Sequence, residues 1–165
     1  MTVYHATTLV HFPLHKPGFE DVTAAAVEAV AASGVQNGLL TVYSQHTTCA
    51  VLIQEEAMDQ TLDGVELLLQ DMVNGLTTLF PTCLHEGQYL HPGPKHLAYA
   101  TDHGEEGWWS LNTDAHLRSV MLGRSQSIPV IDGKLELGEF GRIYFADFDG
   151  VRQRDRKARF TVMGE

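Results

Sequence analysis

The sequence predicts a compact single domain of the α+β class spanning residues 1–165, with two main helices and mainly antiparallel strands. Two observations support this prediction. Helix-like periodicity dominates the first half of the chain, and alternating strand-like segments dominate the second half. Hydrophobic residues make up 44% of the 165 residues, which is enough for a core that needs no disulfide framework.

The main helices are predicted over residues 19–33 and 65–79. The second has apolar residues at spacings of three and four, which places them on one face, and it should end before Pro81. Gly34 follows the first helix, where glycine commonly terminates a helix in the left-handed conformation. A shorter helix is predicted over residues 114–122.

The strands are predicted from β-branched or alternating segments. These are residues 2–11, 39–44, 49–53, 128–131, 134–137, 142–148 and 158–163. The pairs Asp132-Gly133 and Asp149-Gly150 are typical of tight turns and predict two hairpins. Residues 81–112 have little periodicity and are predicted to form one long loop, and such loops are often functional.

The composition narrows the classes of partner. The formal charge is −10, with 21 acidic against 11 basic residues, which argues against a nucleic-acid partner. No apolar run approaches the ~20 residues of a membrane span, so no membrane association is expected. The start of the chain has no signal-peptide pattern and only two cysteines are present, which predicts a cytoplasmic location.

Two polar segments contain candidate site histidines. His46 stands with Thr47 and Thr48 between two predicted strands, a grouping that suits a phosphate or a metal-bound water. The alternative is a hydrogen-bonded turn. Asn112 and His116 lie four residues apart and share a helix face, although Asn112 or Thr113 is equally suited to cap that helix.

Arginines alternate near the end of the chain. Arg152, Arg154 and Arg156 have strand spacing, so their side chains fall on one face and could bind phosphate bidentately. The alternative is a solvated edge strand whose charges prevent aggregation.

The order of these motifs resembles the YjbQ-like family. The shared features are, in chain order, the His-Thr-Thr segment at 46–48, an acidic pair, a long helix, a histidine-rich loop, Asn112-x-Asp114-Ala115-His116-Leu117, Ser125-x-x-Ile128-Pro129-Val130 and Asp149-Gly150-x-Arg152-x-Arg154. The match covers residues 17–165. Members of this family are described as secondary thiamine-phosphate synthases or as proteins of unknown function.

The resemblance implies a β-sandwich-like core, a homotrimer and a histidine pocket that binds a divalent metal, most often zinc. His46 and His116 match the metal ligands. The third histidine is either His103, which has the better distance to His116, or His91, which has the better local pattern; we predict His103. The remaining carried-over residues are catalytic Glu55 and Asn112 and substrate-binding Thr47, Thr48, Arg152 and Arg154.

Two functions follow from the resemblance. The first is a weak thiamine-phosphate synthase activity, a transferase reaction in which cations stabilise the departing pyrophosphate. The second is a non-catalytic protein that binds a small phosphorylated metabolite or a metal. Phe140-Gly141 stands where the family has Trp-Gln, and no nucleophile–base arrangement is recognisable, which favours the second.

Overall fold

The computed structural model describes residues 1–12, 16–151 and 153–165. Within these residues the chain forms two antiparallel sheets and four α-helices, which confirms the predicted α+β class. The strands are β1 Thr2–Phe12, β2 Gly18–Asp21, β3 Gly38–Ser44, β4 Cys49–Glu55, β5 Ser125–Ile131, β6 Lys134–Leu135, β7 Gly141–Asp147 and β8 Arg154–Gly164. The helices are α1 Thr23–Ser33, α2 Leu67–Leu79, α3 Pro94–Asp102 and α4 Thr113–Leu122, with a 3-10 turn, η1, at Gly107–Ser110.

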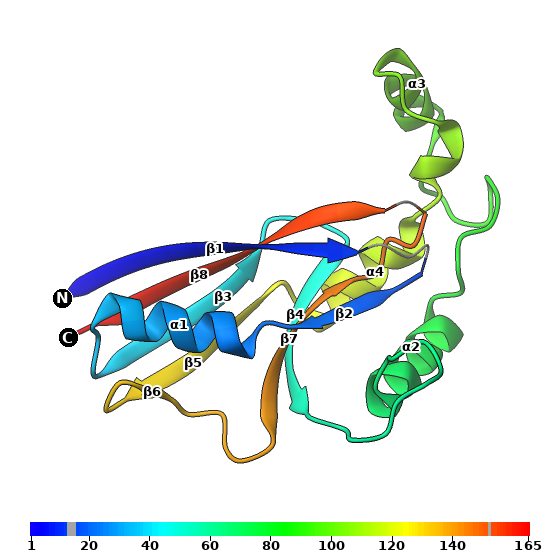
Figure 1. The fold of residues 1–165 in the computed structure, drawn as a ribbon. Coiled ribbons are helices and arrows are strands. Elements are labelled where there is room, and N and C mark those ends of the chain that lie inside the picture. Colours follow the sequence, from blue (N-terminus) through cyan, green and yellow to red (C-terminus); the bar gives the residue numbers. More distant parts are fainter. Residues whose placement is uncertain (13–15, 152) are drawn as a thin grey trace.

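The larger sheet has the strand order β1-β8-β3-β5-β6. Its longest pairing joins β1 to β8 from Thr2 opposite Gly164 to Phe12 opposite Arg154, so the two chain ends lie side by side (Figure 1). The predicted hairpin at Asp132-Gly133 is confirmed, because both residues have positive φ angles, 51° and 72°, between β5 and β6.

The smaller sheet has the order β2-β7-β4. The predicted hairpin at Asp149-Gly150 is wrong, because β7 belongs to this sheet and β8 to the larger one. Both edges of β7 are occupied by β2 and β4, and both edges of β8 by β1 and β3. The turn residues therefore reverse the chain without pairing the strands that flank them, and the chain changes sheets at this point.

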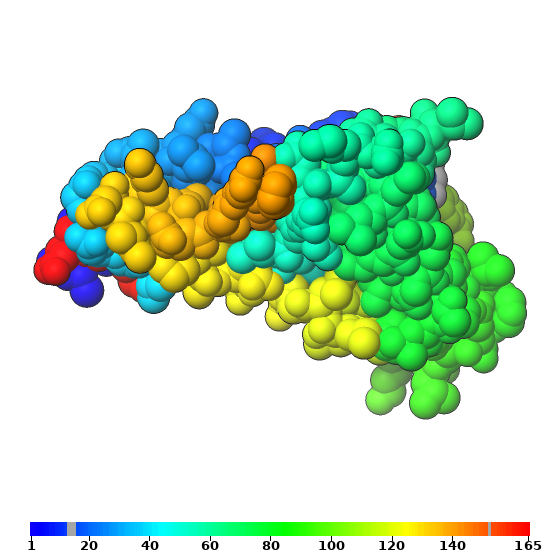
Figure 2. Space-filling model, turned by 90° about the horizontal axis from the view of Figure 1, so that it is seen from below, coloured from blue at the N-terminus to red at the C-terminus, as the bar shows by residue number. Residues whose placement is uncertain are grey.

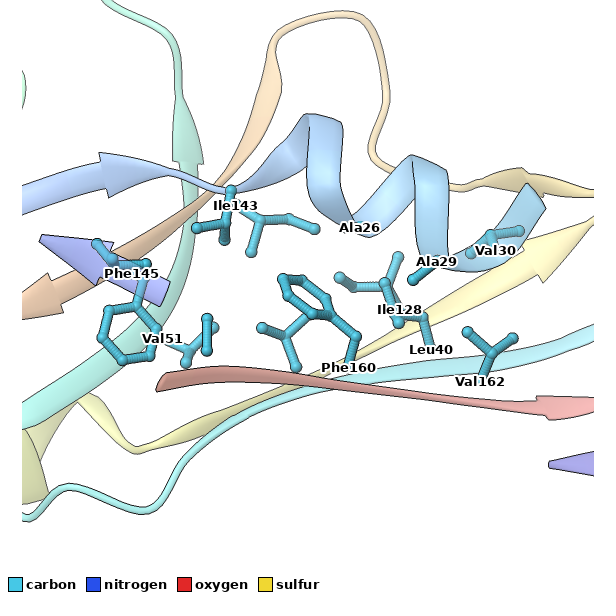
Figure 3. Close-up of a cluster of buried hydrophobic side chains, with 14 of the residues drawn as sticks. Ala26, Ala29, Val30, Leu40, Val51, Ile128, Ile143, Phe145, Phe160 and Val162 are labelled. Carbon is cyan, nitrogen blue, oxygen red and sulfur yellow. The ribbon is translucent and has the colours of Figure 1, made fainter. Parts of the chain in front are cut away.

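The main core lies between the larger sheet and helix α1. Ala26, Ala29 and Val30 face the sheet, where the side chains of Leu40 and Phe160 meet them (Figure 3). The small alanines let the helix approach closely, and the inward positions of β8 alternate with exposed ones as a half-buried strand requires. A second cluster joins the smaller sheet to α2 and α4 through residues that include Leu69, Leu76, Ala115 and Tyr144.

Most predicted helix boundaries agree with the structure. Helix α2 ends at Leu79, before Pro81, and Gly34 ends α1 with a φ of 71°. The first helix was predicted to begin at residue 19, which is wrong, because residues 18–21 form β2 and pair with β7. The Asp21 carboxylate accepts a hydrogen bond from the Thr23 amide at 2.8 Å, which ties the end of β2 to the first residue of α1.

Residues 81–112, here called the arm, are not one long loop as predicted. They contain α3 and η1, and Pro94 stands in the first turn of α3, where its missing N–H costs no hydrogen bond. Helix α3 packs chiefly on η1 and stands away from the sheets (Figure 1). In Figure 2 the green region around α2 and the start of the arm forms one end of the molecule, opposite α1 and β6. No helix among the described residues is long and apolar enough to cross a membrane.

Candidate functional site

The predicted site residues gather where the chain crosses between the two sheets. One crossing joins β3 to β4 through residues 45–48, and the other follows β7. The two crossings lie side by side, because Cys49 pairs with Asp147 and the Phe148 amide donates to the Thr48 carbonyl at 3.0 Å. This arrangement fixes the backbone of the His-Thr-Thr segment against the body of the domain.

A buried ion pair supports the crossing. Arg156 Nε donates to Asp147 Oδ2 at 2.6 Å, and the Thr48 hydroxyl donates to Asp147 Oδ1 at 2.9 Å. Arg156 also donates to the Thr48 hydroxyl from Nη2 at 3.1 Å. The three residues are between 2% and 7% exposed, so each charge is removed from water together with its partner. Thr48 is therefore part of the support of the site.

A second ion pair extends this polar layer. Arg154 donates to Asp149 Oδ2 at 2.8 Å, and the side-chain amide of Asn112 donates from Nδ2 to the same oxygen at 3.2 Å. The Asp149 side chain is fully buried. The negative charge of Asp149 offsets the positive charge of Arg154. The predicted binding of phosphate by Arg154 needs that positive charge, so this ion pair does not support it. Arg152 lies outside the described residues.

His46 is held as a neutral imidazole. The Lys157 amide donates to His46 Nε2 at 3.1 Å, which requires that this nitrogen carry no proton. Desolvation by burial, followed by the positive charge of Arg156, lowers the pKa of His46 below its ordinary value of 6.5. The single ring proton is therefore on Nδ1, and Nε2 accepts the hydrogen bond from the backbone of β8.

Three histidines form a chain of ring contacts that begins beside Thr47. His116 of α4 has Nδ1 at 3.3 Å from the Thr47 carbonyl oxygen, and the ring of His91 stands 5.8 Å from that of His116 at an angle of 86°. His96, from the start of α3, follows at 4.7 Å from His91. We call His91, His96 and His116 the histidine group. It joins two residues of the arm to one residue of the body.

The surroundings keep His91 neutral as well. Desolvation by burial, and then the neighbouring His96 and His116, lower its pKa from 6.5. The Thr113 hydroxyl donates to the His91 carbonyl at 2.6 Å, which ties this part of the arm to the first turn of α4. Thr113 and Asn112 therefore bond to distant segments, and neither side chain caps its own helix.

Two predicted site residues lie elsewhere. His103 ends α3, where its ring stacks on Tyr99 at 3.9 Å and its Nδ1 lies 2.8 Å from the Tyr99 carbonyl. Glu55 ends β4 at the opposite end from Cys49, roughly 20 Å away at the rise of an extended strand. The ring of His91 contacts that of His116, whereas the ring of His103 contacts Tyr99 of its own helix and Glu55 lies at the far end of β4.

The histidine group offers part of a metal coordination shell. Two imidazoles on one zinc ion, with nitrogens about 2.0–2.1 Å from it, have ring centres roughly 5–6 Å apart, which His91 and His116 match. Within residues 1–12, 16–151 and 153–165, however, no three histidine, cysteine, aspartate or glutamate side chains already form a metal site. The donor chemistry suits zinc, while a complete shell requires side-chain movement.

The supporting acids were missed at the sequence level. Asp147 stands inside the apolar run 143–148, and a charged residue in such a run signals a buried charge that needs a partner. Asp149 was predicted to be a turn residue and part of the family motif, without a role as an ion-pair partner. His91 did have a signal in its local pattern, but His103 was preferred for its spacing to His116. The contact of His96 with His91 had no local signal.

Comparison with known proteins identifies the family. The sequence profile described as UPF0047 protein YjbQ-like matches residues 10–165. The chain belongs to this family. A UPF0047 protein of Methanothermobacter thermautotrophicus is 34% identical over 145 residues, which cover 88% of this chain and 82% of that protein. UPF0047 protein YugU of Bacillus subtilis is 29% identical over 134 residues, covering 81% and 82%.

Solved structures of YjbQ-like proteins share the fold. An uncharacterised member from Clostridium acetobutylicum superposes with a TM-score of 0.71 at 27% identity, covering 96% of this chain and 99% of that one. A YjbQ-like protein of unknown function from Sulfolobus solfataricus superposes with a TM-score of 0.76 at 22% identity, covering 99% of both chains. The second likeness shows the fold alone.

The comparisons correct the predicted activity. The thiamine-phosphate synthase function expected from the resemblance is wrong as an assignment, because the matched family is one of unknown function. Its relatives are named UPF0047 proteins, with no synthase in their names, and the structural neighbour from Clostridium is uncharacterised. The transferase reaction and its pyrophosphate chemistry therefore have no support.

Proposed function

We propose that the histidine group binds one divalent transition-metal ion, for which zinc is the best fit. The observation that supports this is the placement of His91 against His116 at a ring separation suited to shared coordination. The lowered pKa of His91 adds to it, because only a neutral imidazole can donate its lone pair to a metal.

The tautomer of His116 also favours this role. With Nδ1–H donating to the Thr47 carbonyl at 3.3 Å, Nε2 carries the lone pair, as in metal sites whose ligands are oriented by a backbone carbonyl. His96 is the nearest source of a third nitrogen, since its ring already contacts His91. His46 belongs to the support of the site in this arrangement, because Nε2 already accepts from Lys157. Zinc held by these residues would supply a Lewis acid to the site.

Metal titration of matched variants tests the proposal. The protein is stripped with a chelator and titrated with Zn²⁺ by calorimetry. We expect one tight ion per chain, and a loss of affinity of about 100-fold or more for His116→Ala and His91→Ala, because each removes a ligand. His103→Ala is the matched control, and it should bind like wild type.

Three results would count against this assignment. Equal affinity in wild type and His116→Ala would remove the site altogether. Loss in His103→Ala with retention in His91→Ala would restore the ligand set predicted from the sequence. Retained metal in His91→Ala with loss in His46→Ala would move the site to the sheet crossing.

We also propose that the chain self-associates, as the predicted homotrimer requires. An apolar row crosses the outer face of the larger sheet, where Val3 pairs with Met163 and Met163 with Leu39. These side chains are between 40% and 49% exposed, and a second copy would cover them.

Light scattering tests the trimer and should give about 55 kDa, three times 18.2 kDa. Met163→Asp should lower this mass, whereas Val120→Asp on α4 should not. The cytoplasmic location stays a prediction.

A further inference from the structure

A cavity of about 380 Å³ opens on the side of α4 that carries Asn112, Asp114 and Arg118. Its other walls come from residues 16–17, 82–84 and 148–151. None of the described histidines lines it, so it is separate from the histidine group. Its volume lies at the lower end of the range for small-molecule sites, about 300–1,000 Å³.

The floor of the cavity contains a buried ion pair. Arg118 is 2% exposed, lies 3.1 Å from Asp114 and donates to the Phe80 carbonyl at 2.7 Å. Its Nε–H has no hydrogen-bond partner among the described residues, although buried donors are normally satisfied. Asp114 accepts from the Cys83 amide at 3.1 Å, so its charge is more completely compensated than that of Arg118.

The mouth of the cavity offers a second cation and an apolar wall. Lys16 pairs with Asp63 at 2.6 Å, but both side chains are partly exposed, so the ammonium keeps donors for another acceptor. Leu84 is 75% exposed at the rim, and Leu111 and Phe148 lie on the walls. A ligand that fills the cavity would cover this apolar surface.

The lining limits the charge of the ligand. Among the described residues each charge of the lining already has a partner of opposite sign: Lys16 pairs with Asp63, Arg118 with Asp114, and Asp149 with Arg154. A dianion such as an alkyl phosphate would add two negative charges beside Asp63, Asp114 and Asp149, whereas a monoanion adds one. A neutral molecule would gain little from the ammonium of Lys16. We propose that this cavity binds a small aliphatic monocarboxylate. Its carboxylate accepts from Lys16 and from the second amide hydrogen of Asn112, and its chain covers Leu84.

Three probes of similar length test the ligand class. Butyrate, butyl phosphate and butanol are titrated into chelator-treated protein at fixed ionic strength and followed by amide chemical shifts. We expect saturable binding of butyrate in the millimolar range, with shifts at residues 82–84 and 148–151. Butyl phosphate and butanol should bind about tenfold more weakly or not at all.

Matched lysine variants test the proposed contact. Lys16→Ala should weaken butyrate binding about tenfold, Lys16→Arg should retain it, and Lys95→Ala on α3 should have no effect. Butyrate should still bind to His116→Ala, so this result is independent of the metal site. Absence of saturable butyrate binding, equal binding in Lys16→Ala, or tighter binding of butyl phosphate would overturn the proposal.

Discussion

The sheet body and the arm both contribute to the histidine group, but different forces hold them. In the body, Val42, Phe145 and Phe160 are 0–1% exposed and belong to strands paired on both sides. In the arm, Leu84 is 75% and Leu90 102% exposed, and Ala100 is the one buried residue among those of α3. The body is stabilised by burial and the arm by a small number of polar contacts.

This difference indicates how the site is assembled. Thr47 and His116 are placed by the core, whereas His91 depends on local ties such as the Thr113 hydroxyl bond to its carbonyl. Regions with few buried contacts open at low free-energy cost. A ligand that bridges His91 and His116 would therefore stabilise the arm more than the body.

The largest expected effect lies in the body. Arg156→Ala leaves Asp147 as an uncompensated buried charge, which should lower the free energy of unfolding by about 3–5 kcal/mol. Urea unfolding followed by circular dichroism measures it. The double variant Arg156→Met, Asp147→Leu removes both charges and should be more stable than the single variant. A loss below 1 kcal/mol for Arg156→Ala would contradict this role of the ion pair.

Much of the body could be predicted from the sequence, because burial there follows local periodicity. The apolar spacing of α2 and the Asp132-Gly133 turn are local signals, and both agreed with the structure. The strand β2 was missed because its pairing with β7 is non-local. The Asp149-Gly150 turn misled for the same reason: turn chemistry specifies a reversal, while the occupied edges of β7 and β8 decide the partners.

The site was predicted only in part. His46, Thr48 and His116 do lie near one another, because the motif order identified the segments that the fold joins. The choice between His91 and His103 depended on the path of the arm, in which the ring of His91 contacts His116 and the ring of His103 stacks on Tyr99 of its own helix. Helix α3 has few apolar residues and buries only Ala100 among its own residues, and its segment was predicted to be loop.

A smaller effect is expected for the hydroxyl within the same network. Thr48→Val keeps the shape of the side chain but removes the donor to Asp147 and the acceptor for Arg156. The loss should be about 1–3 kcal/mol, because buried partners are left unsatisfied. Thr48→Ser, which keeps the hydroxyl, is the matched control. Equal stability of the valine and serine variants would show that the hydroxyl contributes nothing.

The arm should respond locally to a helix-weakening change. Ala100→Gly in α3 costs about 1 kcal/mol of helix stability, because glycine has more conformational freedom to lose. Amide hydrogen exchange should rise about fivefold within residues 94–102, while the global unfolding midpoint stays unchanged. A matching fall in the global midpoint would mean that arm and body unfold as one unit.

The smallest expected effect is a pH dependence at the boundary between the two regions. The pKa values of His46 and His91 are lowered from 6.5, chiefly by desolvation. Below pH 6.5 the unfolded chain therefore binds protons at these positions before the folded chain does. Their contribution to stability is complete above pH 6.5 and is lost as the pH falls through the lower folded values.

Unfolding of chelator-treated protein should thus become easier between pH 6.5 and 5. His46→Gln, whose amide oxygen can still accept from Lys157, should show a shallower decline and match wild type above pH 7.5. An unchanged slope in this variant would mean that His46 is not held neutral by the fold.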